Sequence, residues 1–553
     1  MTRRNLSTLI VRIVLGLGIC ACSATGPGEG SGVDAAADGR AEEIGIEDAP
    51  GRQEDAESAP IPGFCEPNVE EFPLRPDLTE PASLPFLRVE GTELVDPAGA
   101  PVALRGINFG GWLMMETWIA GIGVEDEGEL LDLLREKAAA LGLADALAAA
   151  ELTNALDWLL ERRSHHVLVQ EWRAHMSGHA TANTVAAVEQ LWAWFDEQPW
   201  IFEEEALWSW LEQRFGHAKA QQLRQAFHES YITELDVERV AALGLNLIRV
   251  PVWYQTLETD IEGENHFRAE GWLMLHQLGL WARRLGVYLM IDLHGAPGGQ
   301  STSWHQGLTD AGHLWDHPEC VDKTVRLWQA LASYFAGDAH VAVYDLLNEP
   351  MNFPDSDDYR EVHDAIYAAI RAVDSDHIVM IEDAYRPISD LSSPEEMGWE
   401  NAMFSVHMYP GGTSAQDYLE RIDEDLRDLE DVWPERFGCP LFLGEFNGAD
   451  GTDSAAWAAA SMDLVLARLN ARGVHWAPWT WKYFSESTWG LYHPAQDPGR
   501  KIDVRDSTFE ELLAAFGALH SQNFVPDAAY EQALSGNAAA PPAPLYLGVF
   551  PAE

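Results

Sequence analysis

The sequence predicts a (β/α)₈ barrel, in which eight parallel strands alternate with helices around a closed sheet. Short apolar runs alternate along the chain with longer amphipathic segments of helical period, which is the pattern of a parallel α/β protein. Polar or ionisable side chains stand repeatedly where these apolar runs end. Because the carboxyl ends of all the strands of a barrel meet at one rim, a single site would collect these side chains.

Eight apolar runs are the candidate strands, and several are nearly continuous in Val, Ile and Leu, as expected for parallel strands buried on both faces. They are Leu104–Phe109, Leu245–Val250, Val287–Asp292, Val341–Leu346, Ile378–Glu382, Ala402–His407, Pro440–Glu445 and Val474–Trp479. Helical segments lie between most of them, for example Cys320–Phe335 and Tyr359–Val373. An open doubly wound sheet is the alternative fold, but no glycine-rich phosphate loop follows the first run.

The barrel domain is expected to cover residues 64–525 and to begin with a small hairpin near Leu84, where the sequence alternates and turns. The chain between the first two strands is too long for one crossover. We predict a helical insertion there over about residues 125–240, rich first in Ala and then in Trp. It is expected on the face that carries the strand ends, as a cleft wall, a lid or a packing appendage. Residues 526–553 form a C-terminal tail, which is either a last strand or a plain terminus.

The N-terminus is typical of an export signal. Two arginines precede the apolar run Leu9–Ile19, which is too short for an ordinary membrane span. The run ends in I-C-A-C-S, which resembles the signal of a bacterial lipoprotein, where a lipidated Cys becomes the first residue. Cys22 fits that position better than Cys20, and a plain signal peptide is the alternative. We expect residues 1–22 to be a signal, and the protein to be exported and held at a bacterial membrane only by an N-terminal lipid.

Composition predicts a tether after the signal, and the net charge of the chain argues against a nucleic-acid partner. Residues 23–63 are rich in Gly, Ala, Asp, Glu and Pro with almost no large apolar groups, so we predict a disordered acidic tether. The formal net charge of −54 repels nucleic acid, and neither a nucleic-acid partner nor an oligomer is expected. Cys65, Cys320 and Cys439 lack metal-like spacing. One disulfide among them is allowed in an oxidising compartment, and its pairing stays open.

Six of the eight candidate strands end in side chains that can bind or react. In chain order these are Arg249, His294, the pair Asn348 and Glu349, the pair His407 and Tyr409, Glu445, and the aromatic end W-A-P-W-T-W-K with Trp479 and Trp481. A lone polar residue in such a position is most often a satisfied core group. Six of them at the same end of the strands are better explained by a functional site.

Glu349 and Glu445 are the candidate catalytic residues. Cleavage of a glycosidic bond needs one carboxylic acid to protonate the leaving oxygen and a second carboxyl group to attack or to activate water. Their strands are expected to lie across the barrel from each other, so that the two groups flank one sugar ring. A separation of about 5–5.5 Å would make the enzyme retaining. Both groups are side chains, so the chemistry needs no metal and no organic cofactor, and we expect neither.

The full ordered set resembles glycoside hydrolase family 5, a family of retaining (β/α)₈ enzymes, over roughly residues 85–495. The N-E-P of Asn348–Pro350 resembles the acid/base signature of the family, with Asn348 binding the sugar 2-hydroxyl, and Glu445 in L-G-E-F resembles its nucleophile. The resemblance also implies substrate-binding roles for Arg249, His294, His407 and Tyr409, and sugar stacking on one of Trp479 and Trp481.

Three segments resemble the exo-β-1,3-glucanase branch of that family more closely: Gly106–Ile119, Tyr231–Asp236 and Asp292–Gln300. In that branch the Glu that matches Glu116 helps to bind the terminal glucose. The stretch S-T-S-W-H-Q-G after His294 and the insertion both depart from the branch and lie near the substrate pocket. We therefore expect a hydrolase of a β-glucan or related β-glycoside, with exo action and β-1,3 preference left open.

Two other functions remain as alternatives: the same mechanism on mannan, cellulose or a glycolipid sugar, and a non-catalytic carbohydrate-binding lipoprotein. Some residues also keep two interpretations. Two interpretations are open for Trp112, Trp253 and Trp304, which either line sugar subsites or pack in the core. For Lys482 and Trp489 we expect contacts at the rim of the site. We interpret His305, His313 and His317 as histidines of a surface loop rather than as a metal site, because their spacing is irregular.

Overall fold

The computed structural model describes residues 84–122, 203–259, 267–308, 311–383, 391–411, 414–430, 432–448, 455–484, 489–496 and 502–549, with the single positions 137, 140, 190 and 388. The expected signal with Cys22, the tether, Cys65 and most of the insertion lie outside these ranges and stay predictions. Within them, no helix combines the length and apolar character needed to cross a membrane.

Eight parallel strands form one sheet in the order β10-β9-β8-β7-β6-β5-β4-β3. They are β3 (Gly106–Asn108), β4 (Leu247–Trp253), β5 (Tyr288–Gly295), β6 (Val341–Asp345), β7 (Ile378–Glu382), β8 (Ala402–His407), β9 (Leu441–Glu445) and β10 (His475–Trp476). A parallel bridge between Arg105 and Trp476 joins the two edges and closes the ring. Each strand overlaps one of the predicted runs, although β4 and β5 continue three residues past the predicted ends, and the (β/α)₈ barrel is confirmed.

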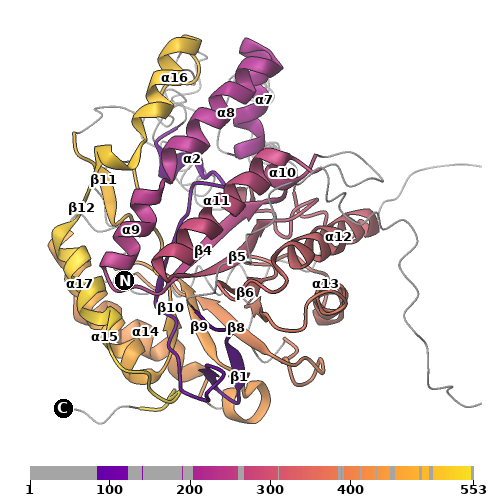
Figure 1. Cartoon of the computed structure of the whole chain (residues 1–553), viewed down its shortest axis with the longest axis vertical. Helices are drawn as coiled ribbons and strands as arrows, with labels where there is room; N and C mark the ends of the chain where they lie inside the picture. Colours follow the sequence, from indigo (N-terminus) through magenta and orange to yellow (C-terminus); the bar gives the residue numbers. More distant parts are fainter. Residues whose placement is uncertain are drawn as a thin grey trace, which may run out of the picture. The chain divides into compact units, whose positions relative to one another are not determined.

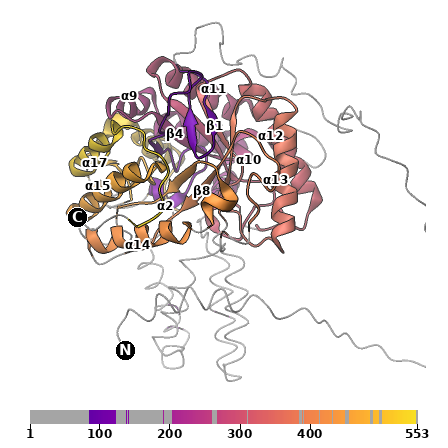
Figure 2. The same ribbon diagram turned by 90° about the horizontal axis from the view of Figure 1, so that it is seen from below.

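Amphipathic helices surround the strands (Figure 2). The long ones are α9 (Glu234–Ala242), α11 (Ala269–Leu285), α12 (Pro318–Phe335), α13 (Ser356–Arg371), α14 (Ala415–Asp428) and α15 (Ala455–Arg472). In α13 the buried residues Tyr359, Val362, Ile366 and Ile370 recur at the spacing of one helical face. Asp355 begins this helix with a capping box, since its carboxylate accepts from the amides of Asp357 and Asp358. The strands are buried throughout, as both faces of the sheet are covered.

A hairpin covers the amino ends of the strands. β1 (Arg88–Glu90) pairs antiparallel with β2 (Glu93–Val95), which confirms the turn expected near Leu84. Leu87 and Leu94 join a core cluster with the first residues of β4 and β5, Leu247 and Tyr288. The barrel is therefore sealed at this end, and the opposite end is left for chemistry.

The described part of the predicted insertion includes an α-helical pair, α7 (Glu204–Phe215) and α8 (His217–Tyr231), which lies beside α16 (Phe509–Ala518) (Figure 1), and the predicted end near residue 240 falls within the barrel helix α9. Rings interlock across this contact: Trp208 and Phe227 both meet Phe516 edge to face, at centroid distances of 6.4 and 5.9 Å. The start of α7 reaches the loops at the carboxyl ends of the strands, where the Glu205 amide donates to the Gly307 carbonyl.

The other elements of the described residues are mostly short. They are α2 (Thr117–Ala120), α10 (Tyr254–Leu257), the 3₁₀ turns η1 (Trp304–Gln306) and η4 (Ser521–Asn523), the π-helical turn η3 (Trp433–Phe437), the antiparallel pair β11 (Tyr492–Pro494) and β12 (Phe524–Pro526), and α17 (Ala528–Ala538). The predicted tail thus contains a helix, which packs on α15, and its described part up to residue 549 has no strand after Pro526.

Candidate active site

Glu349 and Glu445 lie together at the carboxyl ends of the strands. Glu445 is the last residue of β9, and Glu349 follows β6 by four residues. One carboxylate oxygen of each, with a ring nitrogen of His407, forms a buried group whose atoms all lie within 4.8 Å of one another. Two strands, β7 and β8, separate β6 from β9 in the sheet, so the two carboxyl groups face each other across the rim.

The backbone of Glu349 adopts a conformation that non-glycine residues rarely take. Its φ of 42° falls in the left-handed region, which costs free energy unless the surroundings stabilise it. The Glu349 amide donates to Glu382 Oε2 at 2.7 Å, and its carboxylate Oε1 is hydrogen-bonded to His407 Nδ1 at 2.8 Å. The strained turn therefore holds the carboxyl group toward the centre of the rim.

Two donors fix the carboxylate of Glu445, one for each oxygen. Arg249 Nη1 donates to Oε1 at 2.9 Å, and the Tyr409 hydroxyl donates to Oε2 at 2.9 Å. Both contacts agree with the prediction that Arg249, Tyr409 and Glu445, which lie near the ends of different predicted strands, meet at one rim of the barrel. With both oxygens engaged, the carboxylate has one orientation in which to meet a substrate.

Arg249 is the hub beneath the site and is fully buried. Besides Glu445, its guanidinium donates to four acceptors at the ends of β3, β6 and β7: Asp345 Oδ2 at 2.8 Å, Glu382 Oε1 at 2.8 Å, Asn348 Oδ1 at 2.9 Å and Asn108 Oδ1 at 3.1 Å. Asp292 Oδ2 lies 3.0 Å from its Nη2. Burial alone would lower the pKa of Arg249, but the surrounding carboxylates raise it well above its ordinary value.

Three of these carboxylates are absent from the set of site residues that the sequence predicts: Asp292, Asp345 and Glu382. Burial raises the pKa of Asp292 to about 8, and it also raises the pKa of Asp345. Burial opposes ionisation of Glu382 too, but His407 and Arg249 override it and lower its pKa to about 2. Their oxygens cluster within 4.8 Å, but the guanidinium lies among them and supplies the positive charge that a metal ion would bring.

A signal for these carboxylates exists in the sequence. Asp292 lies two residues before His294 on β5, and Glu382 ends β7 as Glu445 ends β9. Side chains two apart on a strand share a face, so an acidic residue two before a predicted site residue should also point into the barrel.

His294 and Asn348 form a second hydrogen-bonded pair. His294 Nδ1 lies 2.7 Å from Asp292 Oδ2, and its Nε2 lies 3.3 Å from Asn348 Nδ2. Burial lowers the pKa of His294 to about 3, so its imidazole stays neutral. Gln300 ties the two loops together by donating to the carbonyls of His294 at 2.7 Å and of Asn348 at 2.8 Å.

Aromatic rings surround the carboxylate pair. Trp479 stacks on His294 with centroids 5.5 Å apart and planes 14° apart. Trp489 contacts Tyr409 at 5.7 Å and Trp118 at 5.2 Å, so the rim position expected for Trp489 agrees with the structure. Flat rings of this kind suit the apolar faces of sugars.

Glu116 lies at the start of α2 and accepts a hydrogen bond from the Trp118 indole at 2.9 Å. Burial raises its pKa well above the ordinary value, and repulsion from Glu445 and Glu349 adds to this effect. The sequence-predicted residues Glu116, Arg249, His294, Asn348, Glu349, His407, Tyr409, Glu445 and Trp479 are thus gathered at one rim.

Two expected contacts are corrected by the structure. Trp481 is fully buried, donates its indole N–H to Asp236 at 2.8 Å and packs on Phe109 and Tyr492, so it has no face for a sugar. Lys482 is also buried, where its ammonium donates to Ser521 at 2.9 Å and to the carbonyl of Tyr231. Burial lowers the pKa of Lys482 to about 8. Trp479 and Trp481, although only two residues apart after β10, therefore have different surroundings.

Trp112 and Trp253 belong to the core, which is one of the two interpretations that the sequence leaves open for them. Both are almost completely buried, and the Trp112 indole donates to the His228 carbonyl at 2.9 Å. Cys320 and Cys439 form no disulfide with each other.

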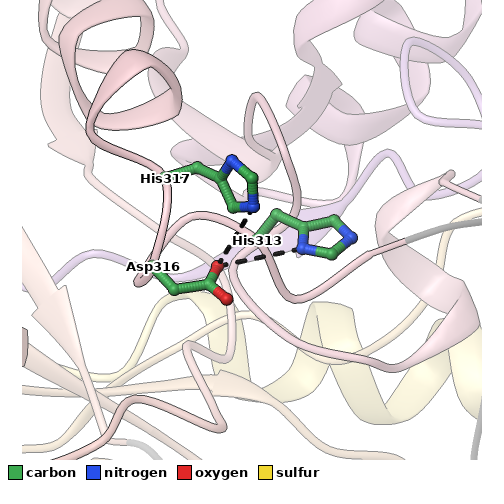
Figure 3. Close-up of side chains that lie close together, drawn as sticks. All are labelled: His313, Asp316 and His317. Atoms are coloured by element: carbon green, nitrogen blue, oxygen red, sulfur yellow. Dashed lines mark ion pairs between the residues drawn. The ribbon is translucent and has the colours of Figure 1, made fainter.

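The three loop histidines separate in the structure. His313, Asp316 and His317 form a half-exposed cluster in the loop before α12 (Figure 3), with ion-pair distances of 3.8 and 3.9 Å to Asp316 Oδ1. His317 Nδ1 also lies 2.9 Å from Glu319 Oε1. His305 is elsewhere: its Nε2 lies 3.4 Å from Glu349 Oε2, so its grouping with the other two histidines is wrong.

The sequence of this chain is similar to a family of glycosyl hydrolases and to several curated relatives. Residues 212–485 match the model of the family described as Cellulase (glycosyl hydrolase family 5). A β-xylosidase of Phanerodontia chrysosporium is 25% identical over 444 residues, covering 76% of this chain and 75% of that protein. Glucan 1,3-β-glucosidases of Blumeria graminis and Candida oleophila are 29% and 30% identical, over 48% and 38% of this chain. These two matches span 65% and 51% of the relatives, about half to two thirds of their length.

Solved structures that align with this chain include an endoglucanase and an endo-glycoceramidase. Endoglucanase Cel5A of Thermotoga maritima aligns with a TM-score of 0.39 at 18% identity, covering 52% of this chain and 90% of that one. Endo-glycoceramidase II of Rhodococcus sp. aligns with the same TM-score at 20% identity, covering 52% and 73%. From the match of its barrel to the family model, this chain belongs to glycosyl hydrolase family 5 and is an O-glycosyl hydrolase.

Proposed function

We propose that the protein hydrolyses β-glucosidic bonds of a glucan or related β-glycoside by double displacement, with Glu349 as acid/base and Glu445 as nucleophile. The observation that carries the proposal is that an oxygen of each carboxyl group lies within 4.8 Å of one of the other. Retaining enzymes keep the two groups about 5–5.5 Å apart, whereas inverting enzymes need about 6.5–9.5 Å to admit a water molecule. The short separation favours direct attack by a carboxylate.

In the first step Glu445 attacks the anomeric carbon while Glu349 donates its proton to the glycosidic oxygen. The bond from the anomeric carbon to that oxygen breaks, its electron pair stays on the oxygen, and a glycosyl ester of Glu445 forms. The donors Arg249 and Tyr409 support this assignment, because they orient the attacking carboxylate. Asn348 lies one residue from Glu349 and is held by Arg249, where its amide can bind the sugar hydroxyl next to the anomeric carbon.

In the second step Glu349, now a carboxylate, removes a proton from water as the water attacks the anomeric carbon. The ester bond breaks, Glu445 leaves as a carboxylate, and the sugar keeps its β configuration. His407 is suited to both steps because it contacts Glu349 at 2.8 Å and lies 3.8 Å from Glu445 Oε2. Burial alone would lower the pKa of His407, but Glu382 and Glu445 raise it well above the ordinary value, which favours a charged imidazole beside both carboxylates.

The substrate proposal is a β-glucan with terminal β-1,3-linked glucose. It is supported by the glucan 1,3-β-glucosidases among the relatives and by the buried Glu116 next to the carboxylate pair. The β-xylosidase relative, which matches over a longer stretch, makes xylosides the second substrate to test. Hydrolysis of laminarioligosaccharides, cellooligosaccharides, mannooligosaccharides, a glycolipid and aryl xylosides, followed by product analysis, would rank these substrates and distinguish exo from endo action.

The mechanism is tested by proton NMR of the anomer first released from an aryl β-glucoside and by two substitutions. We expect the β anomer from the wild type and no turnover from Glu445→Gln. Glu349→Ala should lose about 10²–10⁴-fold in kcat/KM on a glucan. With azide and an activated aryl glucoside, this variant should recover turnover and form a β-glucosyl azide.

Glu90→Gln, which alters an exposed carboxylate on the hairpin, is the matched control and should behave as the wild type. Release of the α anomer would contradict double displacement. A wild type that is inert on the whole panel but binds oligosaccharides would favour the non-catalytic carbohydrate-binding alternative.

We also propose that the protein is exported and anchored through a lipid on Cys22. The support is the charged start, the short apolar run and the I-C-A-C-S sequence that follows it. Metabolic labelling with a fatty acid in a bacterial host, for the wild type and Cys22→Ser, tests this. Label in the wild type alone is expected, and equal label in both would overturn the assignment of Cys22.

A further inference from the structure

The two oxygens of the Glu349 carboxyl group have different histidine neighbours. Oε1 is 2.8 Å from His407 Nδ1, at the end of β8. Oε2 is 3.4 Å from Nε2 of His305, which comes from the 3₁₀ turn η1 in the loop after β5. His407 has a fully buried side chain, whereas 17% of the His305 side chain is exposed. His305 is therefore the neighbour on the open side of the acid/base.

The different neighbours give the two oxygens of Glu349 different roles in proton transfer. A protonated carboxyl group carries its proton on one oxygen, and Oε1 is already engaged by a full hydrogen bond with His407. The proton that leaves for the glycosidic oxygen is then on Oε2, the oxygen that faces His305. The distance of 3.4 Å between Oε2 and His305 Nε2 is longer than a good hydrogen bond, so the imidazole limits the positions open to Oε2 without holding its proton, which can pass to the glycosidic oxygen.

The turn that carries His305 is built to hold one position. The side chain of Gln306 accepts from the Ser301 amide at 3.0 Å and donates to the Ser303 carbonyl at 2.9 Å, which closes the turn on itself. A Cβ on Gly295 would come within 2.3 Å of the Gln306 carbonyl, so the turn packs directly against the end of β5. Gly307, at φ 86°, packs on Trp253 and Met114. The His305 backbone is consequently fixed on both sides.

The His305 ring also lies next to the stacked rings of His294 and Trp479. It meets His294 edge to face with centroids 6.0 Å apart, and His294 in turn stacks on Trp479. This places the His305 imidazole beside the acid/base and in line with the rings that suit a sugar. The stretch S-T-S-W-H-Q-G that supplies His305 is the one in which the sequence departs from its resemblance to the exo-β-1,3-glucanase branch.

We propose that His305 is a positioning residue for proton transfer: it restrains Oε2 of Glu349 on the side of the departing sugar, so that the proton is directed at the glycosidic oxygen. The proposal rests on the assignment of Glu349 as acid/base. The proton itself comes from Glu349 and goes to the leaving oxygen, and His305 neither gains nor loses one in the step. Its contribution is confined to substrates whose leaving group needs protonation.

The test compares aryl β-glucosides of poor and good leaving ability in His305→Ala, His305→Gln and the wild type. For phenyl β-glucoside, we expect His305→Ala to lower kcat/KM about 10–100-fold, a part of what a general acid contributes. The loss should be in kcat rather than KM. For 2,4-dinitrophenyl β-glucoside, which leaves without protonation, kcat/KM should stay within about threefold of the wild type, because general-acid assistance is not needed there. His305→Gln, whose amide reaches as far as Nε2, should recover part of the loss on phenyl glucoside.

His313→Ala is the matched control, because it removes a histidine of the same loop that pairs with Asp316 instead. It should behave as the wild type on both substrates. An equal loss on both aryl glucosides in His305→Ala would mean a general structural role, and no loss on either would mean no role; each result overturns the proposal. If Glu349→Ala is also fully active on phenyl glucoside, the failure belongs to the proposed function and not to His305 alone.

Discussion

At the scale of single residues, the site is organised by one buried cation. Arg249 is hydrogen-bonded to carboxylates of β6, β7 and β9 and ion-paired with one of β5, and it also reaches the amides of Asn108 and Asn348. Burial is the main cause that raises the pKa of Asp292 to about 8, with repulsion from Glu382 adding to it, whereas His407 and Arg249 together lower the pKa of Glu382 to about 2. A guanidinium suits this position because its planar donors reach several acceptors at once.

The Tyr409 hydroxyl gives the first prediction at this scale. Tyr409→Phe removes the donor to Glu445 Oε2 and keeps the ring that contacts Trp489. Because one preorganised donor in an active site is worth about 10²–10³-fold in rate, we expect a loss of kcat in that range. The free energy of unfolding should change by about 1 kcal/mol or less. Steady-state kinetics and urea unfolding measure the two quantities.

Tyr367→Phe is a suitable control, because the Tyr367 ring stacks on Trp399 and its hydroxyl accepts from the Glu400 amide, away from the carboxylate pair. If Tyr409→Phe keeps full kcat, the hydroxyl does not orient the nucleophile.

At the scale of elements, the insertion is joined to the rim by a buried carboxylate. Glu204, the first residue of α7, accepts from the Met115 amide at 2.7 Å and from the Trp208 indole at 2.8 Å. Burial raises its pKa to about 7, although Arg224 and the two hydrogen bonds act in the opposite direction. The described part of the insertion is therefore attached to the segment that carries Glu116, rather than hanging free of the barrel.

This carboxylate makes the stability of the protein depend on pH. Folding raises the pKa of Glu204 from its ordinary value of 4.5 to about 7, so the folded protein binds the proton more tightly than the unfolded chain does. The contribution of this proton to stability is complete below about pH 4.5 and is lost as the pH rises to about 7. A shift of that size corresponds to at most about 3 kcal/mol.

The prediction is that the wild type loses stability between about pH 5 and pH 7 relative to Glu204→Gln, whose amide does not titrate. Urea unfolding of both proteins at several pH values measures this difference. Glu205→Gln, which changes the neighbouring half-buried carboxylate, should follow the wild type. A constant difference between wild type and Glu204→Gln over this range would refute the argument.

At the scale of the whole barrel domain, the C-terminal helix closes the structure beside the first and last strands. Arg105, next to β3, donates to the carbonyls of Ala538 at 3.1 Å and of Pro541 at 3.3 Å, and to the side chain of Asn470 at 2.7 Å. Tyr530 and Leu534 of α17 are buried in the main core. The tail thus connects the two strands whose pairing completes the ring.

We therefore expect removal of residues 528–553 to destabilise the barrel strongly. Buried side chains such as Leu534 contribute about 1.5–3 kcal/mol each, and Arg105 would be left with fewer acceptors in a buried position. Thermal unfolding followed by circular dichroism should show a clearly lower midpoint. A shorter truncation after Val549 keeps all of these contacts and should unfold at the temperature of the full chain. Equal midpoints for both truncations would show that α17 is dispensable.

The sequence by itself determined the eight strands, the order of the helices and most of the residues at the rim. This was possible because strand pairing and helix packing both leave a period in the sequence, and because parallel strands place their carboxyl ends together whatever the details of closure. Glu349, Glu445, Arg249 and Tyr409 therefore meet where their positions along the chain predict.

The tertiary structure decided which neighbours these residues have. In the closed ring Trp479 stacks on His294, whereas Trp481 and Lys482 lie among buried partners. The loop after β5 brought His305 to Glu349 and left His313 and His317 elsewhere. The physical reason is that periodicity records only whether a side chain faces inward, while contacts between loops depend on distances across the barrel that no local pattern encodes.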